Sequence, residues 1–188
     1  GYMIYYSLLN PAEDQYDRVF YSYADATFTR LTKPRLLVDW GYATIDADIN
    51  YVPADGLYHM LIKKEGGTPG IFAATATKLT GPYKIKDEND YVKFEGNKKC
   101  EGCSAFQLVG DSTWRVAYIE YSSKPKRYRI CQADEKLANF HSPVTMEGVK
   151  HPQHGSFMRL TEEEYKRLQE WSDSIMRERA ARNSGEKK

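Results

Sequence analysis

One pattern of short strands occurs twice in this chain, and it restricts the possible folds more than any other feature of the sequence. In the first copy Asp46 precedes Tyr58 by 12 residues, and in the second Glu101 precedes Trp114 by 13 residues. The two acids lie 55 residues apart, within runs of aromatic and β-branched residues that Gly, Pro, Asn and Asp separate. A period of about 40 to 55 residues with four strands per unit is typical of β-propeller blades. The sequence therefore predicts an all-β fold built from blades.

The expected strands account for roughly two complete blades and part of another. They cover residues 2–9, 18–23, 34–40, 43–52, 58–63, 70–77, 83–86, 104–109, 114–121 and 128–133, with a further strand in 151–160. The segment 1–40 fits a blade that lacks its innermost strand. Because a propeller closes with about four to eight blades, we expect residues 1–160 to be a partial propeller, the C-terminal part of a larger domain.

A different pattern begins at residue 161. Thr161 followed by Glu164 is a capping box, which predicts a helix that starts here. Apolar residues then recur at helical spacing, and they are Tyr165, Leu168, Trp171, Ile175 and Met176. We expect a helix over residues 161–182 that packs on the propeller, and a disordered tail over 183–188.

Composition excludes several functional classes. The 188 residues carry a net charge of +1, which gives no electrostatic reason to expect a nucleic-acid partner. No run of about 18 apolar residues indicates a membrane span. The 15 Tyr residues suit strands, and aromatic rings also stack on sugar rings.

The three cysteines do not indicate a disulfide framework. Cys100 and Cys103 make a C-x-x-C pair, which invites a redox or zinc interpretation with His151 and His154 as further ligands. The setting and spacing match neither a thioredoxin motif nor a zinc finger. Buried free thiols, including Cys131, are the favoured interpretation.

Acidic residues stand at corresponding places in the two copies of the strand pattern. Asp46 and Asp48 lie in an otherwise apolar strand, and an alternation of period 2 would place both on one face. They belong either to an edge strand that shows acids to water or to a polar site. Since inner strands of a propeller face a common axis, Asp46 and Glu101 would converge on one pocket. Paired carboxylates across a pocket suit glycoside hydrolysis, in which one donates a proton and the other activates water.

Two further residues are open to both a structural and a functional interpretation. His154, followed by Gly155, is either a hydrogen-bonded turn residue or a polar ring brought close to the axis. Trp40 is either a core residue or a ring that stacks on a sugar, and the same alternatives hold for Tyr121.

Taken in order, these motifs resemble glycoside hydrolase family 43, the five-bladed propeller arabinofuranosidases and xylosidases. The similarity extends from about residue 2 to residue 171. It rests on residues 45–49 followed by 56–60, on the turn at 79–83, on 101–104 and on 154–156. Cys103 stands where the family usually has proline, which is expected to alter the local turn more than the chemistry.

The resemblance implies an inverting hydrolase that removes arabinofuranosyl, xylosyl or related residues from plant-type saccharides. Glu101 would be the general acid and Asp46 the residue that modulates its pKa, while the catalytic base would precede residue 1. His154, Lys63 and Trp40 would contact the sugar. No cofactor is implied as required, although some family members carry a calcium ion at the axis, here near His154. Export from the cytoplasm is expected if the full-length protein has a leader.

Two other interpretations remain open. Because the base would lie outside the chain, these residues could form a non-catalytic carbohydrate-binding or interaction module. A retaining, sucrose- or fructan-acting propeller is the third possibility, but its Asn-Asp-Pro and Arg-Asp-Pro motifs do not occur in the sequence.

Overall fold

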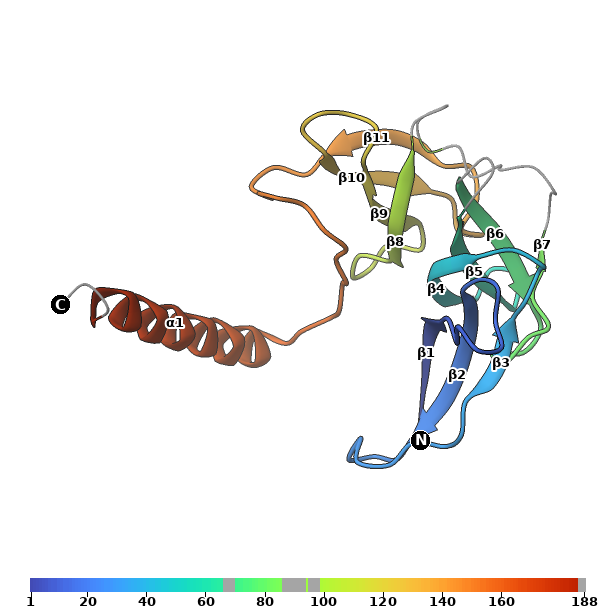
Figure 1. The fold of residues 1–188 in the computed structure, drawn as a ribbon. Helices are drawn as coiled ribbons and strands as arrows, with labels where there is room; N and C mark the ends of the chain where they lie inside the picture. Colours follow the sequence, from blue (N-terminus) through green and yellow to red (C-terminus); the bar gives the residue numbers. More distant parts are fainter. Residues whose placement is uncertain (66–69, 86–93, 95–98, 186–188) are drawn as a thin grey trace. The chain divides into compact units, whose positions relative to one another are not determined.

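Three antiparallel sheets follow one another along the chain in the computed structural model, which describes residues 1–65, 70–85, 94 and 99–185 (Figure 1). The first sheet contains β1 (Tyr2–Leu8), β2 (Arg18–Ala24) and β3 (Arg35–Val38). The second contains β4 (Thr44–Val52), β5 (Leu57–Lys64), β6 (Gly70–Ala76) and β7 (Lys84–Ile85). The third contains β8 (Cys100–Phe106), β9 (Trp114–Glu120), β10 (Arg127–Ala133) and β11 (His141–Thr145).

Each sheet is made of strands that are consecutive in sequence, as the repeated pattern predicted. The mostly β fold is therefore confirmed. β4 contacts β1 of the first sheet and β8 of the third sheet, so the second sheet lies between the other two. The sheets of the described residues form no closed ring.

The end of the third sheet differs from the prediction. Residues 151–160 contain no strand, and the last strand is β11 instead. β11 escaped detection because it includes Ser142 and Pro143, and proline is unfavourable within strands. It is tolerated here because β11 lies at the sheet edge and pairs only with β10. β8 also starts earlier than expected, at Cys100 instead of residue 104.

The second sheet is buried on both faces. Leu61 of β5 belongs to a hydrophobic cluster that includes Val116 and Tyr118 of the third sheet. Its neighbours Met60 and Ile62 belong to another cluster, which also contains residues of the first sheet. Successive side chains of a strand point to opposite faces, so β5 contributes to both cores by alternation.

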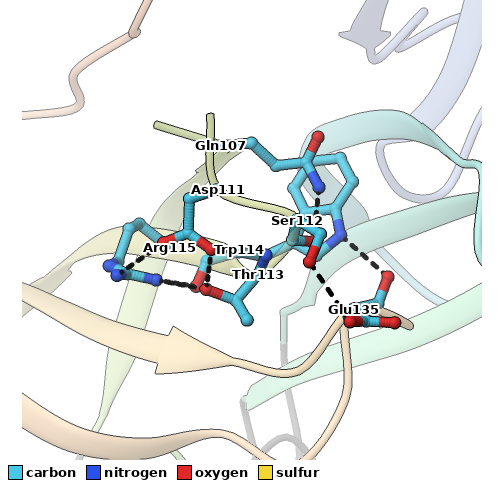
Figure 2. Close-up of polar contacts among 7 residues, drawn as sticks. All are labelled: Gln107, Asp111, Ser112, Thr113, Trp114, Arg115 and Glu135. Carbon is cyan, nitrogen blue, oxygen red and sulfur yellow. Dashed lines mark hydrogen bonds and ion pairs between the residues drawn. The ribbon is translucent and has the colours of Figure 1, made fainter. Parts of the chain in front are cut away.

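The turn between β8 and β9 is fixed by a polar network (Figure 2). The Asp111 carboxylate accepts hydrogen bonds from the Thr113 backbone N–H at 2.8 Å and from Arg115 at 3.1 Å. The Trp114 indole N–H donates to the Glu135 carbonyl at 3.2 Å and so joins this turn to the loop after β10. This network holds the hairpin that carries the β8 strand of the candidate site.

The C-terminal segment, residues 157–188, forms a unit of its own with helix α1 (Glu162–Gly185). The capping box is confirmed: Thr161 Oγ1 accepts from the Glu164 N–H at 3.2 Å, and the Thr161 N–H donates to the Glu164 carboxylate at 2.8 Å. The helix continues to residue 185, three residues beyond the expected end at residue 182. Residues 186–188 lie outside the described part, and packing of α1 on the sheets stays a prediction. Neither α1 nor any other described helix is long and apolar enough to cross a membrane.

Candidate active site

A β-bulge interrupts strand β4 at the predicted acids. Ile45 pairs with Lys63 and Asp48 pairs with Leu61, so two residues of β4 oppose one residue of β5. Asp46 occupies the bulge with a φ of 55°, in the left-handed region that Asp and Asn tolerate better than most residues. The bulge breaks the regular alternation between Asp46 and Asp48, on which the prediction of one shared face depended.

Strand β8 has a bulge of the same kind. The extra residue lies between Glu101 and Ser104, and Gly102 has a φ of 61°. The position in β8 that corresponds to Asp46 is therefore Gly102, and Glu101 precedes it by one residue. The two acids occupy nearly equivalent places, as the spacing suggested, but not the same one.

Both acids approach the same histidine. His154 Nε2 lies 3.7 Å from Asp46 Oδ2 and 3.9 Å from Glu101 Oε1. The carboxylates are largely buried, with side chains 19% and 22% exposed, whereas the His154 side chain is 47% exposed. Asp46 and His154 also line a pocket of about 200 Å³, and Glu101 precedes its lining residue Gly102 in the chain. Three residues that are distant in sequence thus meet at one place.

Burial and charge act on Asp46 together. Burial is the largest influence and raises the pKa of its carboxyl, and the nearby Glu101 carboxylate raises the pKa further. The positive charges of His154 and Lys63 oppose this rise. The net effect favours a proton on Asp46 compared with an exposed aspartate.

Gly102 provides the space that the His154 ring occupies. A Cβ atom at residue 102 would lie 2.4 Å from His154 Cδ2 and 2.6 Å from Cγ, closer than carbon atoms can approach. The positive φ of Gly102 also disfavours any residue with a side chain. The bulge in β8 therefore positions Glu101 and admits His154 at the same time.

We expect Gly102→Ala to lower the free energy of unfolding by about 1–3 kcal/mol, because of the positive φ and the displaced His154 ring. The His154 imidazole resonances in an NMR spectrum should shift as the ring moves. Gly110→Ala is the matched control, because Gly110 has a φ of 83° but no atom within 4 Å of a built Cβ. An unchanged His154 spectrum in Gly102→Ala would contradict the close contact.

Lys63 lies behind Glu101. Its side chain is 4% exposed, and its ammonium forms an ion pair with Glu101 and lies 2.7 Å from Glu65 Oε1. The Tyr121 ring covers the ammonium, with 4.7 Å between Nζ and the ring centroid. Burial disfavours the charge of Lys63, but the hydrogen bonds to Glu101 and Glu65 outweigh burial and raise its pKa.

Asp48 binds across the gap between the second and third sheets. Its Oδ2 accepts hydrogen bonds from the Ala105 backbone N–H at 2.9 Å and from Asn50 at 2.7 Å. Burial raises the pKa of Asp48 to about 6, although both hydrogen bonds favour the ionised form and lower it. Asp48 therefore links β4 to β8 next to the candidate site.

The raised pKa of Asp48 predicts a dependence of stability on pH. Since the folded state holds this proton more tightly than the unfolded chain, the contribution is full below about pH 4 and is lost as the pH rises through about 6. Asp48→Asn removes this loss, which is on the order of 3 kcal/mol, and keeps an acceptor for Ala105. Urea denaturation should therefore show the variant gaining stability over the native protein between pH 4 and pH 7. Parallel pH curves for the two proteins would contradict the assignment.

Residues 1–166 match the model of a family that is related to glycoside hydrolase family 43 and is described as "Probable glycosyl hydrolase domain". The chain belongs to this family. The resemblance that the ordered motifs indicated is therefore confirmed. No curated protein matches the sequence significantly.

Solved structures share the fold of this family 43-related domain. An endo-arabinase from Bacteroides thetaiotaomicron VPI-5482 has a TM-score of 0.52 at 11% identity, covering 76% of this chain and 50% of the arabinase. A thermostable family-43 glycoside hydrolase has a TM-score of 0.53 at 16% identity, covering 79% and 51% of the respective chains. The chain thus spans about half the length of the two solved structures.

The other residues singled out in the sequence lie at different places in the family 43-related domain. Trp40 packs against the core cluster shared by the first and second sheets, with its ring centroid 6.4 Å from that of Tyr42, and does not line the His154 pocket. Cys100, Cys103 and Cys131 are buried and form no disulfide with one another. The roles proposed for Trp40 and Lys63 in sugar contact stay predictions.

The calcium ion implied by the resemblance stays a prediction. Ca²⁺ takes six to eight oxygen ligands in proteins. The carboxylates of Asp46 and Glu101 approach His154, but among the described residues no group of three His, Cys, Asp or Glu side chains could hold a metal ion. We therefore assign no step of the chemistry to a metal ion.

Sequence reasoning missed the partners of the site residues. Glu65 follows Lys63 by two residues, and strand alternation could have placed both on the side that faces β8. Tyr5 lines the pocket, and its hydroxyl accepts a hydrogen bond from the Ile49 N–H at 3.3 Å. No signal in the sequence distinguishes Tyr5 from the many other strand tyrosines.

Proposed function

We propose that the domain to which this chain belongs hydrolyses glycosidic bonds, with Glu101 as the general acid. The observation that carries the proposal is the approach of two carboxylates, from strands of neighbouring sheets, to His154 Nε2 at 3.7 and 3.9 Å. Carboxylates are the groups that glycoside hydrolysis requires. Membership of a family described as a probable glycosyl hydrolase domain supports the same chemistry.

In the proposed reaction Glu101 gives its proton to the departing glycosidic oxygen as the bond from that oxygen to the anomeric carbon breaks. A base carboxylate takes a proton from water, and the water oxygen bonds to the anomeric carbon from the opposite face. Asp46 orients Glu101 and adjusts its acidity. We propose that the base lies in a part of the domain outside these 188 residues, in keeping with solved structures about twice as long.

The proposed complete domain is a five-bladed propeller, to which the three sheets contribute. The proposed substrates are arabinofuranosyl, xylosyl or related residues of plant-type saccharides. The fold shared with an endo-arabinase supports this choice at the level of substrate class. Assays of the full-length gene product against a panel of 4-nitrophenyl glycosides would identify the sugar.

We expect hydrolysis with inversion, because the proposed base activates water directly instead of bonding to the sugar. Proton NMR of the first product formed from the best aryl glycoside should show the anomer opposite to the substrate. Initial product that retains the configuration of the substrate would contradict the inverting mechanism, while leaving hydrolysis itself established.

A non-catalytic carbohydrate-binding role is the second candidate, and the ion pair between Lys63 and Glu101 favours it. A carboxylate paired with a buried ammonium is stabilised in its ionised form, whereas a general acid must carry a proton. Turnover of any glycoside in the panel by the full-length protein would exclude this role. Saccharide binding without turnover, measured by calorimetry, would support it.

A further inference from the structure

Lys63 is the buried charge that contacts the proposed acid. It lies on β5 two residues after Leu61, so by alternation both face the third sheet, where Glu101 lies. A buried ammonium is costly unless it is paired. Glu101, Glu65 and the Tyr121 ring together meet this requirement and hold the Lys63 side chain in one position.

This arrangement makes the two carboxyl oxygens of Glu101 different. Oε2 contacts Lys63, and Oε1 lies 3.9 Å from Nε2 of His154, a residue that lines the pocket. The ammonium has three donors and no acceptor, so a proton on Oε2 would compete with the contact to Lys63. The proton that Glu101 donates is therefore best carried on Oε1.

We propose that Lys63 is a positioning residue that fixes the Glu101 carboxyl so that Oε1 delivers the proton, and that Glu65 limits the effect of Lys63 by sharing its charge. This inference rests on the proposed function, because it assumes that Glu101 is the general acid. In this role Lys63 acts through Glu101 and does not need to contact the sugar.

The charges around Glu101 determine the expected effect on the pH dependence of turnover. The Asp46 carboxyl group on β4 and the Lys63 ammonium on β5 lie on different sides of Glu101 and are the charged groups that can act on it. Glu65 draws the ammonium toward itself, Tyr121 covers it, and His154 approaches from the segment after β11. Since a general acid must be protonated, activity falls on the alkaline side of the pH profile.

The alkaline limb of the pH profile is expected to shift in one direction when Lys63 is removed and in the opposite direction when the charge of Glu65 is removed. Lys63→Met should lower kcat about 10- to 100-fold with little change in KM, because the carboxyl loses its fixed orientation. Its alkaline limb should move to higher pH, since a cation is lost next to the proposed acid. Glu65→Gln should move the same limb to lower pH, because Lys63 then pairs with Glu101 alone.

The experiment measures pH profiles of kcat and KM for the full-length protein, with the best 4-nitrophenyl glycoside as the probe. Lys64→Met is the matched control, since the Lys64 ammonium lies over the Tyr42 ring at 4.6 Å and strand alternation places Lys64 on the opposite face of β5 from Lys63. Its profile should match that of the native protein. A native profile and kcat in Lys63→Met would overturn the proposal, as would shifts of both variants in the same direction.

Two further measurements separate this proposal from the proposed function. If Glu101→Gln retains full activity, the acid assignment fails; if Glu101→Gln is inactive while Lys63→Met is native, only the role of Lys63 fails. Nitrogen-15 NMR of the lysine ammonium groups requires no activity. One ammonium signal protected from exchange with water should vanish in Lys63→Met and lose its protection in Glu101→Gln, and the absence of any such signal would overturn the ion pair.

Discussion

Glu101→Gln is expected to reduce kcat on a 4-nitrophenyl glycoside by about 10²- to 10⁴-fold, the usual contribution of a general acid. The amide keeps the size of the side chain but has no acidic proton to give to the leaving oxygen. The loss should be much smaller on a 2,4-dinitrophenyl glycoside, whose leaving group departs without protonation. Parallel assays of the two substrates with the full-length protein make this measurement.

Glu65→Gln is the matched control for this variant. Both glutamates pair with the Lys63 ammonium, so both changes disturb the same ion pair, but only Glu101 approaches His154. Glu65→Gln should retain kcat within about tenfold of the native value at its own optimum. Equal losses in the two variants, or equal losses on the two leaving groups, would show that Glu101 acts through the ion pair and not as an acid.

Asp46→Asn is expected to lower kcat by about 10- to 100-fold with a folded protein. Asparagine is chosen because it tolerates the φ of 55° at this bulge, so loss of activity would not arise from strain. The change removes an acidic group that lies with Glu101 beside His154 and that is proposed to orient Glu101. Steady-state kinetics of the variant and of the native full-length protein on the same 4-nitrophenyl glycoside make this measurement.

Asp48→Asn provides the comparison within the same strand. The Asp48 carboxylate is engaged by Ala105 and Asn50, and Asp46 is the β4 acid that approaches His154. We expect Asp48→Asn to change kcat by less than about tenfold, while it alters the pH dependence of stability described above. A larger loss in Asp48→Asn than in Asp46→Asn would reverse the roles assigned to the two acids.

Most of the β architecture could be predicted from the sequence because strand and turn signals alternate clearly. The exceptions have local causes. Pro143 concealed β11, and the run around His154 was given a strand that the backbone does not form. Strands are recognised in a sequence by their composition, and a strand at a sheet edge can contain residues such as proline that interior strands exclude.

The site could be predicted in part. The convergence of Asp46 and Glu101 was expected from the arrangement of inner strands, whereas His154 was open to a structural and a functional interpretation; the structure brings all three together. The two bulges were not expected, because a bulge is a matter of pairing between strands and leaves little trace in either sequence. Without knowledge of the two bulges, the ion pair of Lys63 with Glu101 could not be inferred from the sequence either.

The double burial of β5 has a consequence for how residues 1–156 unfold. Leu61 is packed with the third sheet, and Met60 and Ile62 are packed with the first, so neither neighbour can separate without exposing one face of the same strand. Exposing either face of β5 to water costs hydrophobic free energy, and it also weakens the strand on which the other sheet packs. The three sheets should therefore melt in a single cooperative transition, and not blade by blade in the manner of independent repeats.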